Sequence, residues 1–422
     1  MIASASSTSS RPPPIVVNGR TYRWPKRPTI VICFDGCDPD YLAAASRAGM
    51  VPSIDAMRAD GFAATALAAM PTFTNPNNVS IVCGVPPAIH GVSGNYYIDP
   101  LSGREVMMID AAPMRAPTIL AAFANEGARV VAVTAKDKLR KALAKDLKGV
   151  AFSAEAAGSC TKAENGIANV TEIVGRGVPD QYSADLSLFV LDAGVQFLKA
   201  DRPDIMYLSL SDYIQHKHAP ESPQALAFMA EVDARVGQLI GGGAVVGIVA
   251  DHGMSDMTRD DGTPNVLYVG EVLDAAFGSH GVRVICPITD PFVRHHGALG
   301  GFVRVYVTQG GPSAERVAAF LQELPGIEMA LLREEVCRAF DLPVDREGDV
   351  AVIARRGIAL GARRADHDLA QLAGERLRSH GGLAERNVPF ILSHPVTAAQ
   401  NVDGSVIRNF DIFAFALNCV EV

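Results

Sequence analysis

Three aspartates each close a short apolar run of the sequence: Asp35 ends "VICFD", Asp212 ends "YLSLSD" and Asp251 ends "GIVAD". Two histidines accompany them, because His216 follows Asp212 by four residues and His252 follows Asp251 directly. If the apolar runs are parallel strands, these side chains meet at the carboxyl edge of one sheet. Acids gathered there repel one another unless a cation lies between them. Mixed carboxylate and imidazole ligands suit Zn²⁺ or Mn²⁺ better than Mg²⁺ or Ca²⁺.

The number of candidate ligands predicts two metal ions, because a tetrahedral zinc takes only four ligands. Among the other histidines, His380 in "SHGGLAERNVPF" is the best further candidate, since its glycines allow a close backbone approach. His218 is a weaker candidate for a ligand or a substrate contact. The predicted cofactors are two Zn²⁺ ions, with Mn²⁺ or Fe²⁺ as substitutes. For any single aspartate, capping of a turn or helix is the alternative.

A polar segment, "PTFTNPNN" (71–78), precedes an apolar run and predicts the start of a helix, with Pro76 in the first turn. Thr74 is then placed where the helix dipole and free amide groups favour an alkoxide or a phosphoryl group. Two-metal sites are typical of hydrolysis or phosphoryl transfer, so Thr74 is the predicted nucleophile. The alternative is that Thr74 only caps the helix. Thr72 is predicted to be structural, and the asparagines Asn75, Asn77 and Asn78 are predicted to shape the turn.

Strands and helices alternate along most of the chain. The expected strands are 29–36, 128–138, 204–212 and 243–253, and the expected helices include 184–200 and 222–240, the latter with Ser222 as N-cap. This alternation predicts an α/β protein whose mainly parallel sheet has helices on both faces. The C-terminal runs 387–396 and 410–420 are expected to rejoin that sheet.

The predicted domain organisation has three parts. Residues 1–20 are rich in Ser and Pro and are expected to form a flexible leader. Residues 21–257 and 373–422 are expected to form the core, and 258–372 a smaller α+β cap that includes a helix beginning near Pro312.

Composition excludes some classes of function. The chain has 422 residues, 48% of them hydrophobic and 20% charged, with a formal net charge of -8, which argues against a nucleic-acid-binding protein. The seven cysteines are scattered, which suggests a reducing compartment. No apolar run approaches the roughly 18 residues of a membrane span. A cytoplasmic protein without membrane contact is therefore expected, and the sequence leaves open whether it forms a homodimer.

Read in order, the motifs "FDG", "PT-x-T-x-PN", "HG-x-x-x-N", "D-x-x-x-H", "DHG" and a late "HG" resemble the alkaline phosphatase superfamily. Within it, they are similar to the nucleotide pyrophosphatase/phosphodiesterase branch, and the resemblance spans most of the chain. It implies the alkaline-phosphatase-like fold and an asparagine, Asn95, that holds a phosphoryl oxygen. It also implies two zinc sites, one formed by Asp212, His216 and His380 and the other by Asp35, Asp251, His252 and the oxygen of Thr74.

Two departures narrow the resemblance. The chain has "TNPN" where phosphodiesterases of the branch commonly carry "TFPN", and it has a stretch, "TAKDKLRKAL" (134–143), that they lack. This stretch and "DPFVRHHGALGGF" (290–302) resemble the superfamily members that cleave the carbon–phosphorus bond of phosphonoacetate. Lys136 and Lys138 are then expected to bind the substrate carboxylate, with Arg294 as a weaker candidate. A solvated helix start is the alternative for both lysines.

The expected reaction is metal-dependent hydrolysis of a small phosphonate, phosphonoacetate, to acetate and phosphate. A carbanion is a poor leaving group, so positive charge from Lys136 and Lys138 is expected to stabilise its delocalisation into the carboxylate. One alternative is a phosphoester hydrolase like the nucleotide pyrophosphatases. The other is a metal-stabilised phosphonate-binding protein without turnover.

Overall fold

The structure, a computed structural model, describes residues 12–99, 101–288, 298–372, 374–397 and 406–421. Its largest sheet has seven strands in the order β4-β19-β10-β3-β9-β7-β8. Strands β10, β3, β9, β7 and β8 are parallel, whereas β19 is antiparallel to β10 and to β4. The prediction of a mainly parallel sheet is therefore confirmed. The bounds are β3 Thr29–Cys33, β4 Phe62–Leu67, β7 Val130–Thr134, β8 Val150–Ser153, β9 Ile205–Ser209, β10 Val245–Val249 and β19 Asn387–Leu392.

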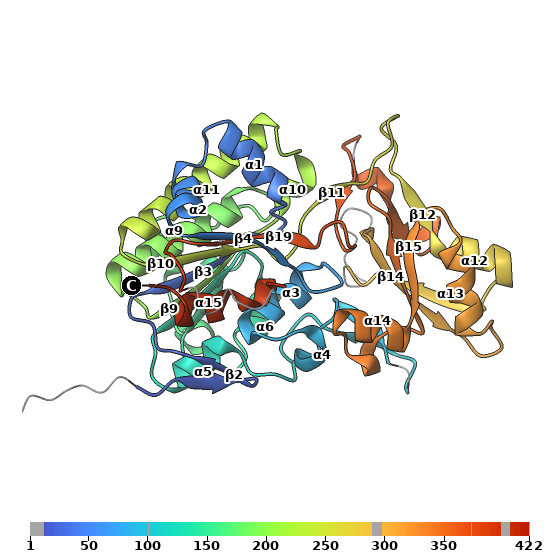
Figure 1. The fold of residues 1–422 in the computed structure, drawn as a ribbon, viewed down its shortest axis with the longest axis horizontal. Helices are drawn as coiled ribbons and strands as arrows, with labels where there is room; N and C mark the ends of the chain where they lie inside the picture. The colour runs from blue at the N-terminus through green and yellow to red at the C-terminus, as the bar shows by residue number, and fades with distance from the viewer. Residues whose placement is uncertain (1–11, 100, 289–297, 373, 398–405, 422) are drawn as a thin grey trace, which may run out of the picture.

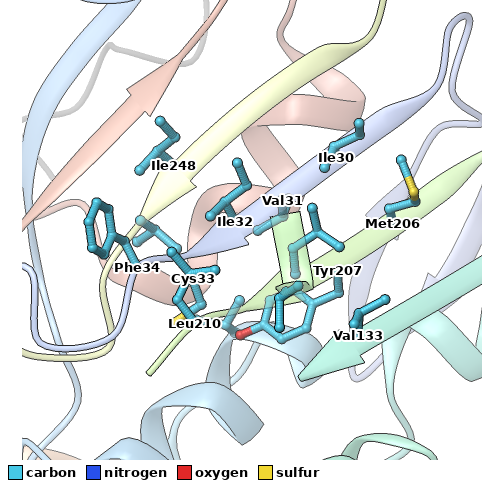
Figure 2. Close-up of a cluster of buried hydrophobic side chains, with 14 of the residues drawn as sticks. Ile30, Val31, Ile32, Cys33, Phe34, Val133, Met206, Tyr207, Leu210 and Ile248 are labelled. Atoms are coloured by element: carbon cyan, nitrogen blue, oxygen red, sulfur yellow. The ribbon is translucent and has the colours of Figure 1, made fainter. Parts of the chain in front are cut away.

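Helices cover both faces of this sheet (Figure 1). One face carries α1 Pro39–Arg47, α2 Pro52–Asp60, α9 Asp185–Ala200 and α11 Pro223–Gly241. The other carries α3 Thr74–Cys83, α5 Ile119–Asn125, α6 Asp137–Leu143 and α15 Ile412–Asn418. Because both faces are covered, every residue of β3, β9 and β10 is buried, as a central parallel strand requires. Figure 2 shows the resulting core, with Ile30, Ile32, Met206 and Ile248 in one apolar cluster.

The helix starts follow the expected local chemistry. The side chain of Ser222 accepts a hydrogen bond from the Ala225 amide at 3.2 Å, and Pro223 is the first residue of α11. Helix α3 begins at Thr74, with Pro76 in its first turn. Both predicted helix starts are confirmed.

The expectation that 410–420 rejoins the sheet is wrong. Only the first of the two C-terminal runs does so, as β19, whereas the second forms a 3-10 turn, Asn409–Asp411, and then α15. The buried residues of α15 are Ile412, Phe413, Ala416 and Leu417, a spacing that puts them on one helical face. A short apolar run does not distinguish a strand from a buried helix, and here the helix packs on β10 and β3.

The described part of the expected leader is ordered. Strand β1, Ile15–Val17, pairs with β2, Arg20–Tyr22, across the Asn18–Gly19 turn. Both turn residues have positive φ, as a two-residue hairpin requires. Ile15 and Val17 are buried in the main core, so apolar alternation orders the chain from this point.

A second sheet lies within the segment expected to form the cap. It is antiparallel, with the order β13-β14-β16-β15 (Val282–Ile285, Phe302–Val307, Val350–Ala354 and Ile327–Leu332). Helices α12 Val269–Phe277 and α13 Ala314–Gln322 share an apolar cluster with it. A different cluster joins α14, Arg333–Phe340, and β14 to Phe73, whose ring is 6.1 Å from that of Phe302. The residue before Thr74 is therefore packed against the second sheet.

Shorter elements connect these layers. They are α4 Pro87–His90, β5 Tyr96–Ile98, β6 Glu105–Met107, α7 Lys162–Asn165, α8 Val170–Val174, α10 Tyr213–Lys217, β11 Ser255–Asp256, β12 Val266–Tyr268, β17 Ala359–Gly361 and β18 Arg378–Ser379. Among the described helices, none combines the length and the apolar character that crossing a membrane would need.

Candidate active site

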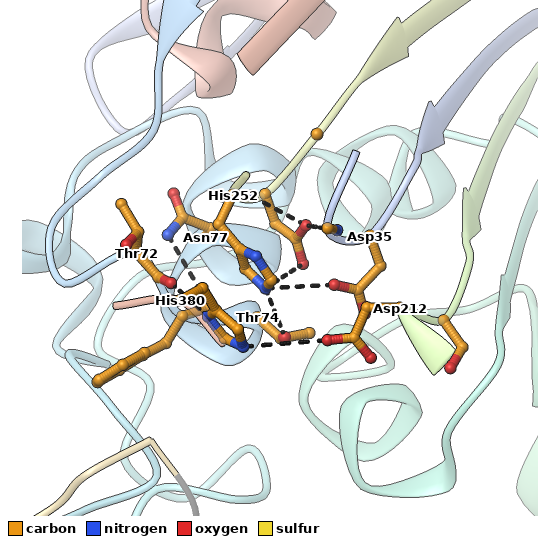
Figure 3. A network of polar contacts seen from close by, with 12 residues as sticks. Asp35, Thr72, Thr74, Asn77, Asp212, His252 and His380 are labelled. Carbon is orange, nitrogen blue, oxygen red and sulfur yellow. Dashed lines mark hydrogen bonds and ion pairs between the residues drawn. The ribbon is translucent and has the colours of Figure 1, made fainter. Parts of the chain in front are cut away.

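The three strand-end aspartates lie together because their strands are neighbours. Strand β3 lies between β10 and β9, and all three are parallel, so Asp35, Asp251 and Asp212 leave the same edge of the sheet. Strand β7, the neighbour of β9, leads to Lys136 at that edge. Figure 3 shows Asp35, Asp212 and His252, which follow three different strands, turned toward one centre.

Two groups of candidate ligands form there. The ligand atoms of Asp212, His216 and His380 lie within 4.8 Å of one another, and so do those of Asp35, Asp212 and His252. His216 Nε2 is 2.7 Å from Asp212 Oδ2, and His252 Nε2 is 3.3 Å from Asp35 Oδ1. The first group is the set that the resemblance implies for one zinc ion. The second group contains Asp212, which the resemblance assigns to the first ion only.

Asp251 lies beside the second group. Its side chain is fully buried, and its Oδ2 is 3.9 Å from His252 Nε2. The other oxygen, Oδ1, accepts hydrogen bonds from the backbone amides of Gly36 at 3.2 Å and His252 at 3.0 Å. The carboxylate is therefore held in one orientation behind the second group.

Backbone carbonyl groups fix the tautomer of all three histidines. The Nδ1–H of His216 donates to Arg378 O at 2.8 Å, that of His252 to Gly253 O at 2.8 Å and that of His380 to Thr72 O at 2.7 Å. A carbonyl oxygen only accepts, so Nδ1 carries the hydrogen and Nε2 of a neutral ring presents its lone pair to the carboxylates. Close contacts between such nitrogen and oxygen atoms require a proton or a cation between them. A ring N–H that donates to a backbone carbonyl in this way is typical of histidine metal ligands.

The electrostatics of the cluster also fit a cation. Burial, together with repulsion from Asp212 and Asp251, raises the pKa of Asp35 well above its usual value. Burial raises the pKa of Asp212 as well, but the attraction of His216, His380 and His252 outweighs it and holds that pKa well below the usual range. Among the described residues, the buried Asp35 Oδ1 has no hydrogen-bond partner. An orphaned carboxylate oxygen beside imidazole nitrogens is what a bound metal ion would satisfy.

Thr74 faces this cluster from the first position of α3. Its Oγ1 is 3.1 Å from His252 Nε2, as Figure 3 shows. Thr72 instead faces the loop after His380, where its hydroxyl donates to Gly382 O at 2.9 Å and accepts from the Gly381 amide at 3.0 Å. Thr74 therefore faces the Asp/His cluster, whereas Thr72 holds the loop that carries His380.

A cavity of about 400 Å³ opens onto the cluster. It is lined by the predicted site residues Asp35, Thr74, Asn95, Lys136, Lys138, Asp212, His216 and His380, and also by Ile288, Ala298 and Leu299 from the segment expected to form the cap. Lys136 Nζ donates to Gln181 O at 2.8 Å and lies 3.9 Å from Glu155 Oε1. Both predicted lysines thus share one cavity with Thr74.

Of the other predicted substrate contacts, Asn95 lines the cavity and His218 does not. The Asn95 amide Nδ2 donates to Ile288 O at 2.6 Å, which places Asn95 between the main core and the second sheet. His218 follows α10 and is absent from the cavity lining, and its carbonyl accepts a hydrogen bond from the Tyr41 hydroxyl. Arg294 lies outside the described residues.

Sequence reasoning missed two buried groups that support the ligands. Asn78, predicted to shape the turn, donates to Asp251 Oδ2 at 3.0 Å, and its position four residues after Thr74 is the one signal for this. Glu385 accepts from the Gly382 amide at 2.9 Å and from the Ser255 hydroxyl, while its carbonyl accepts from the Gly253 amide at 2.7 Å. It joins the two loops that carry His252 and His380, and nothing in its sequence context predicts that role.

A parallel sheet that brings acidic and imidazole ligands up to a threonine at a helix start is the arrangement of hydrolases in the alkaline phosphatase superfamily. The chain belongs to the type I phosphodiesterase / nucleotide pyrophosphatase family, whose sequence profile matches residues 29–382. The predicted family membership and fold are thus confirmed.

Solved structures show which members of the family this chain is similar to. Phosphonoacetate hydrolase from Sinorhizobium meliloti 1021 in complex with phosphonoformate is 47% identical, with a TM-score of 0.92 over 97% of this chain and 99% of that chain. The same hydrolase in complex with phosphonoacetate is 46% identical over the same shares, also with a TM-score of 0.92. Murine ectonucleotide pyrophosphatase / phosphodiesterase 5 in complex with AMP is 17% identical, with a TM-score of 0.61 over 94% of this chain and 96% of that chain, and supports the fold alone. The predicted resemblance to phosphonoacetate hydrolase is confirmed.

Proposed function

We propose that this protein hydrolyses the carbon–phosphorus bond of phosphonoacetate to acetate and phosphate, with Thr74 as the nucleophile. The observation that carries the proposal is the single cavity in which Lys136 and Lys138 face the same space as Thr74 and the Asp/His cluster. A substrate with a phosphonate at one end and a carboxylate at the other matches this distribution of charge. The two structures at 46% and 47% identity, which hold phosphonoacetate and phosphonoformate, support the same substrate class.

The residues present fit two zinc ions, with Mn²⁺ or Fe²⁺ as substitutes. Asp212, His216 and His380 would hold one ion, and Asp35, Asp251, His252 and the Thr74 oxygen would hold the other. When bound, the ions supply positive charge that polarises the phosphonate and lowers the pKa of a neighbouring hydroxyl group.

The chain's own residues account for the remaining steps. The Thr74 hydroxyl gives its proton to solvent and its Oγ1 attacks phosphorus. An O–P bond forms while the P–C bond breaks, and the electron pair of that bond moves into the substrate carboxylate. The ammonium groups of Lys136 and Lys138 stabilise the charge that develops there, and the carbon then takes a proton from solvent. The Asn95 amide donates to a phosphonate oxygen. Water finally hydrolyses the phosphothreonine ester and releases phosphate.

The test is an assay of the zinc-loaded protein with phosphonoacetate in which phosphate and acetate are both measured. Equal amounts of the two products are expected. Inert phosphonoacetate combined with rapid turnover of a nitrophenyl phosphodiester would instead identify a phosphodiesterase. A rapid-quench experiment on a single turnover tests the binding-protein alternative, because a protein that only binds phosphonates forms neither phosphothreonine nor free phosphate.

A further inference from the structure

The side chain of Asn78 is fully buried and makes four hydrogen bonds. Its Nδ2 donates to Asp251 Oδ2 at 3.0 Å and to Thr74 O at 3.0 Å. Its Oδ1 accepts from the Tyr207 hydroxyl at 2.7 Å and from the Ser209 hydroxyl at 2.9 Å. Both hydrogens and both lone pairs of the amide are therefore used.

The orientation of this amide follows from its partners. On one side, the Asp251 carboxylate and the Thr74 carbonyl only accept hydrogen bonds, so the NH₂ group must face them. A flipped amide would bring its oxygen against two acceptor oxygens in a site without water access. The two hydroxyl groups on the other side then donate to Oδ1. Asn78 is thus held from both sides in one rotamer.

These bonds connect the elements that build the candidate active site. Asn78 lies on α3, whose first residue is the proposed nucleophile, while Asp251 follows β10, and Tyr207 and Ser209 belong to β9. The Asp251 Oδ1 atom is already held by two backbone amides. Asn78 supplies the donor to Oδ2, the oxygen on the side of His252 Nε2. Asn78 therefore adds a third hydrogen bond to that carboxylate and ties it to the first turn of α3.

The neighbouring Asn77 shows what a purely structural amide at this place looks like. It is equally buried, but its partners are the preceding turn and the C-terminal segment. It accepts from the Ala69 amide at 2.7 Å and from Asn409 Nδ2 at 2.8 Å, and it donates to Ala69 O at 3.0 Å and to Phe73 O at 3.1 Å. No hydrogen bond of Asn77 reaches an Asp or His of the described cluster. The two asparagines are therefore a matched pair in burial and in helix position.

We propose that Asn78 is a positioning residue that sets the carboxylate plane of Asp251 and couples it to the backbone of Thr74. Through this coupling, the metal site that includes Asp251 and the nucleophile share one geometry. The assignment rests on the proposed function for the roles of Asp251 and Thr74. It goes beyond that function because it makes metal affinity, and not only catalysis, depend on a residue that contacts neither substrate nor metal.

The test compares Asn78→Ala with Asn77→Ala in the full chain. Asn78→Ala is expected to weaken Zn²⁺ binding by about 10- to 100-fold in a chelator-competition titration, the size of effect known for groups that hydrogen-bond to metal ligands. It should also change the visible absorption of the Co²⁺-loaded protein and lower kcat more than it raises KM. Asn77→Ala is expected to lower the free energy of unfolding while Zn²⁺ affinity stays within about threefold of wild type.

A second pair of variants removes only the hydroxyl groups that donate to Asn78 Oδ1. Tyr207→Phe and Ser209→Ala each delete one donor to Oδ1 and are expected to weaken Zn²⁺ binding by a smaller factor. In the Asn78→Ala background, Tyr207→Phe should have no further effect on Zn²⁺ affinity, because its action passes through Asn78. These milder variants keep the test decisive if Asn78→Ala does not fold.

Wild-type Zn²⁺ affinity in Asn78→Ala would overturn the proposal, as would unchanged affinity in both milder variants or equal losses in Asn77→Ala and Asn78→Ala. Failure of the proposed function gives a different pattern. In that case the wild-type protein leaves phosphonoacetate intact, while Zn²⁺ affinity and the Co²⁺ spectrum still respond to Asn78.

Discussion

Thr74 stands out at the residue scale because of where its hydroxyl group is held. It occupies the first position of α3, where backbone amide groups point outward, and its Oγ1 contacts His252 Nε2 at 3.1 Å. Its backbone carbonyl is bonded to Asn78, which restricts the main chain that carries it. The hydroxyl is thus held at the boundary between the Asp/His cluster and the cavity.

Substitution of this hydroxyl tests its role directly. Thr74→Ala is expected to lower kcat for phosphonoacetate by at least about 10³-fold, because the variant lacks the hydroxyl that is proposed to attack phosphorus. Metal analysis on the same sample should show nearly unchanged zinc content, since Asp and His ligands remain. Thr74→Ser is the matched control and should keep measurable turnover. Comparable activity in Thr74→Ala and wild type would exclude Thr74 as the nucleophile.

The two cavity lysines are expected to act on the leaving group. Lys136→Ala or Lys138→Ala should lower kcat/KM for phosphonoacetate by about 10²- to 10³-fold, because each removes charge stabilisation at the developing carbanion. A nitrophenyl phosphoester, whose leaving group needs no such help, should lose less than about tenfold. Lys141 on the same helix pairs with Asp137 and is absent from the cavity lining, so Lys141→Ala is the control. Equal losses on both substrates would remove this role.

Most of the candidate ligands could be selected from sequence because they directly follow an apolar strand or stand in a short Asp/His spacing, and His380 was selected for the glycines beside it. The residues that support them were not. Asn78 and Asp251 are 173 positions apart, and the contact between them exists only because the fold brings α3 to the residue that follows β10. Glu385 likewise bonds to Ser255, 130 positions earlier in the chain. Such pairings depend on tertiary packing and leave no local pattern.

At the scale of elements, α3 and the turn that leads to Asn95 are joined by His90, the last residue of α4. His90 Nε2 is 2.7 Å from Ser80 Oγ, and His90 Nδ1 accepts from the Val92 amide at 3.2 Å. The ring is therefore neutral with its hydrogen on Nε2. Burial, with a smaller contribution from Arg346, lowers the pKa of His90 to about 3.

This shift predicts a pH dependence of stability. Between about pH 6.5 and pH 3, the unfolded chain binds a proton at His90 and the folded chain does not, so stability falls as pH falls. The difference in unfolding free energy between wild type and His90→Gln should therefore shrink by about 1.4 kcal/mol for each unit of pH lowered in this window. Urea denaturation of both proteins at pH 4, 5 and 6 measures it. A difference that stays constant with pH would mean that His90 is not buried as the neutral form.

Helices were predicted correctly where the sequence contained both a capping residue and a long apolar pattern, as for α11 with Ser222 and Pro223. The error at 410–420 has a physical cause, since seven apolar-rich residues satisfy either a strand or a helix. The neighbouring β19 already occupies the place beside β10, so the last segment packs on the face of the sheet instead.

For the whole molecule, the joint between the main core and the second sheet depends on a buried ion pair. Arg304 on β14 and Glu347 are both fully buried and bonded to each other, with Nη2 to Oε2 at 3.0 Å. Arg304 also donates to Ser93 O at 2.9 Å and to Tyr96 O at 3.0 Å, on either side of Asn95. The second sheet thus holds the segment that is proposed to bind a phosphonate oxygen.

Removing one partner of this pair should be costly. Glu347→Gln leaves the charge of Arg304 buried without compensation and is expected to lower the free energy of unfolding by about 3–5 kcal/mol in urea denaturation. Glu328→Gln, which removes an exposed pair with Arg355, is the control and should cost less than about 1 kcal/mol. A similar small loss in both variants would show that the joint does not depend on this pair.

The histidine orientation has a consequence for how the sequence is free to change. Each ring is aimed by a main-chain oxygen, from Thr72, Gly253 or Arg378, and every amino acid supplies such an oxygen. Substitutions at Arg378 therefore leave the acceptor of His216 in place, whereas an insertion or deletion nearby would displace it. The orientation of the three imidazole rings therefore depends on the path of the backbone and not on side-chain identity. A change in metal preference would have to come from the carboxylates and from the Asn78 amide that holds Asp251.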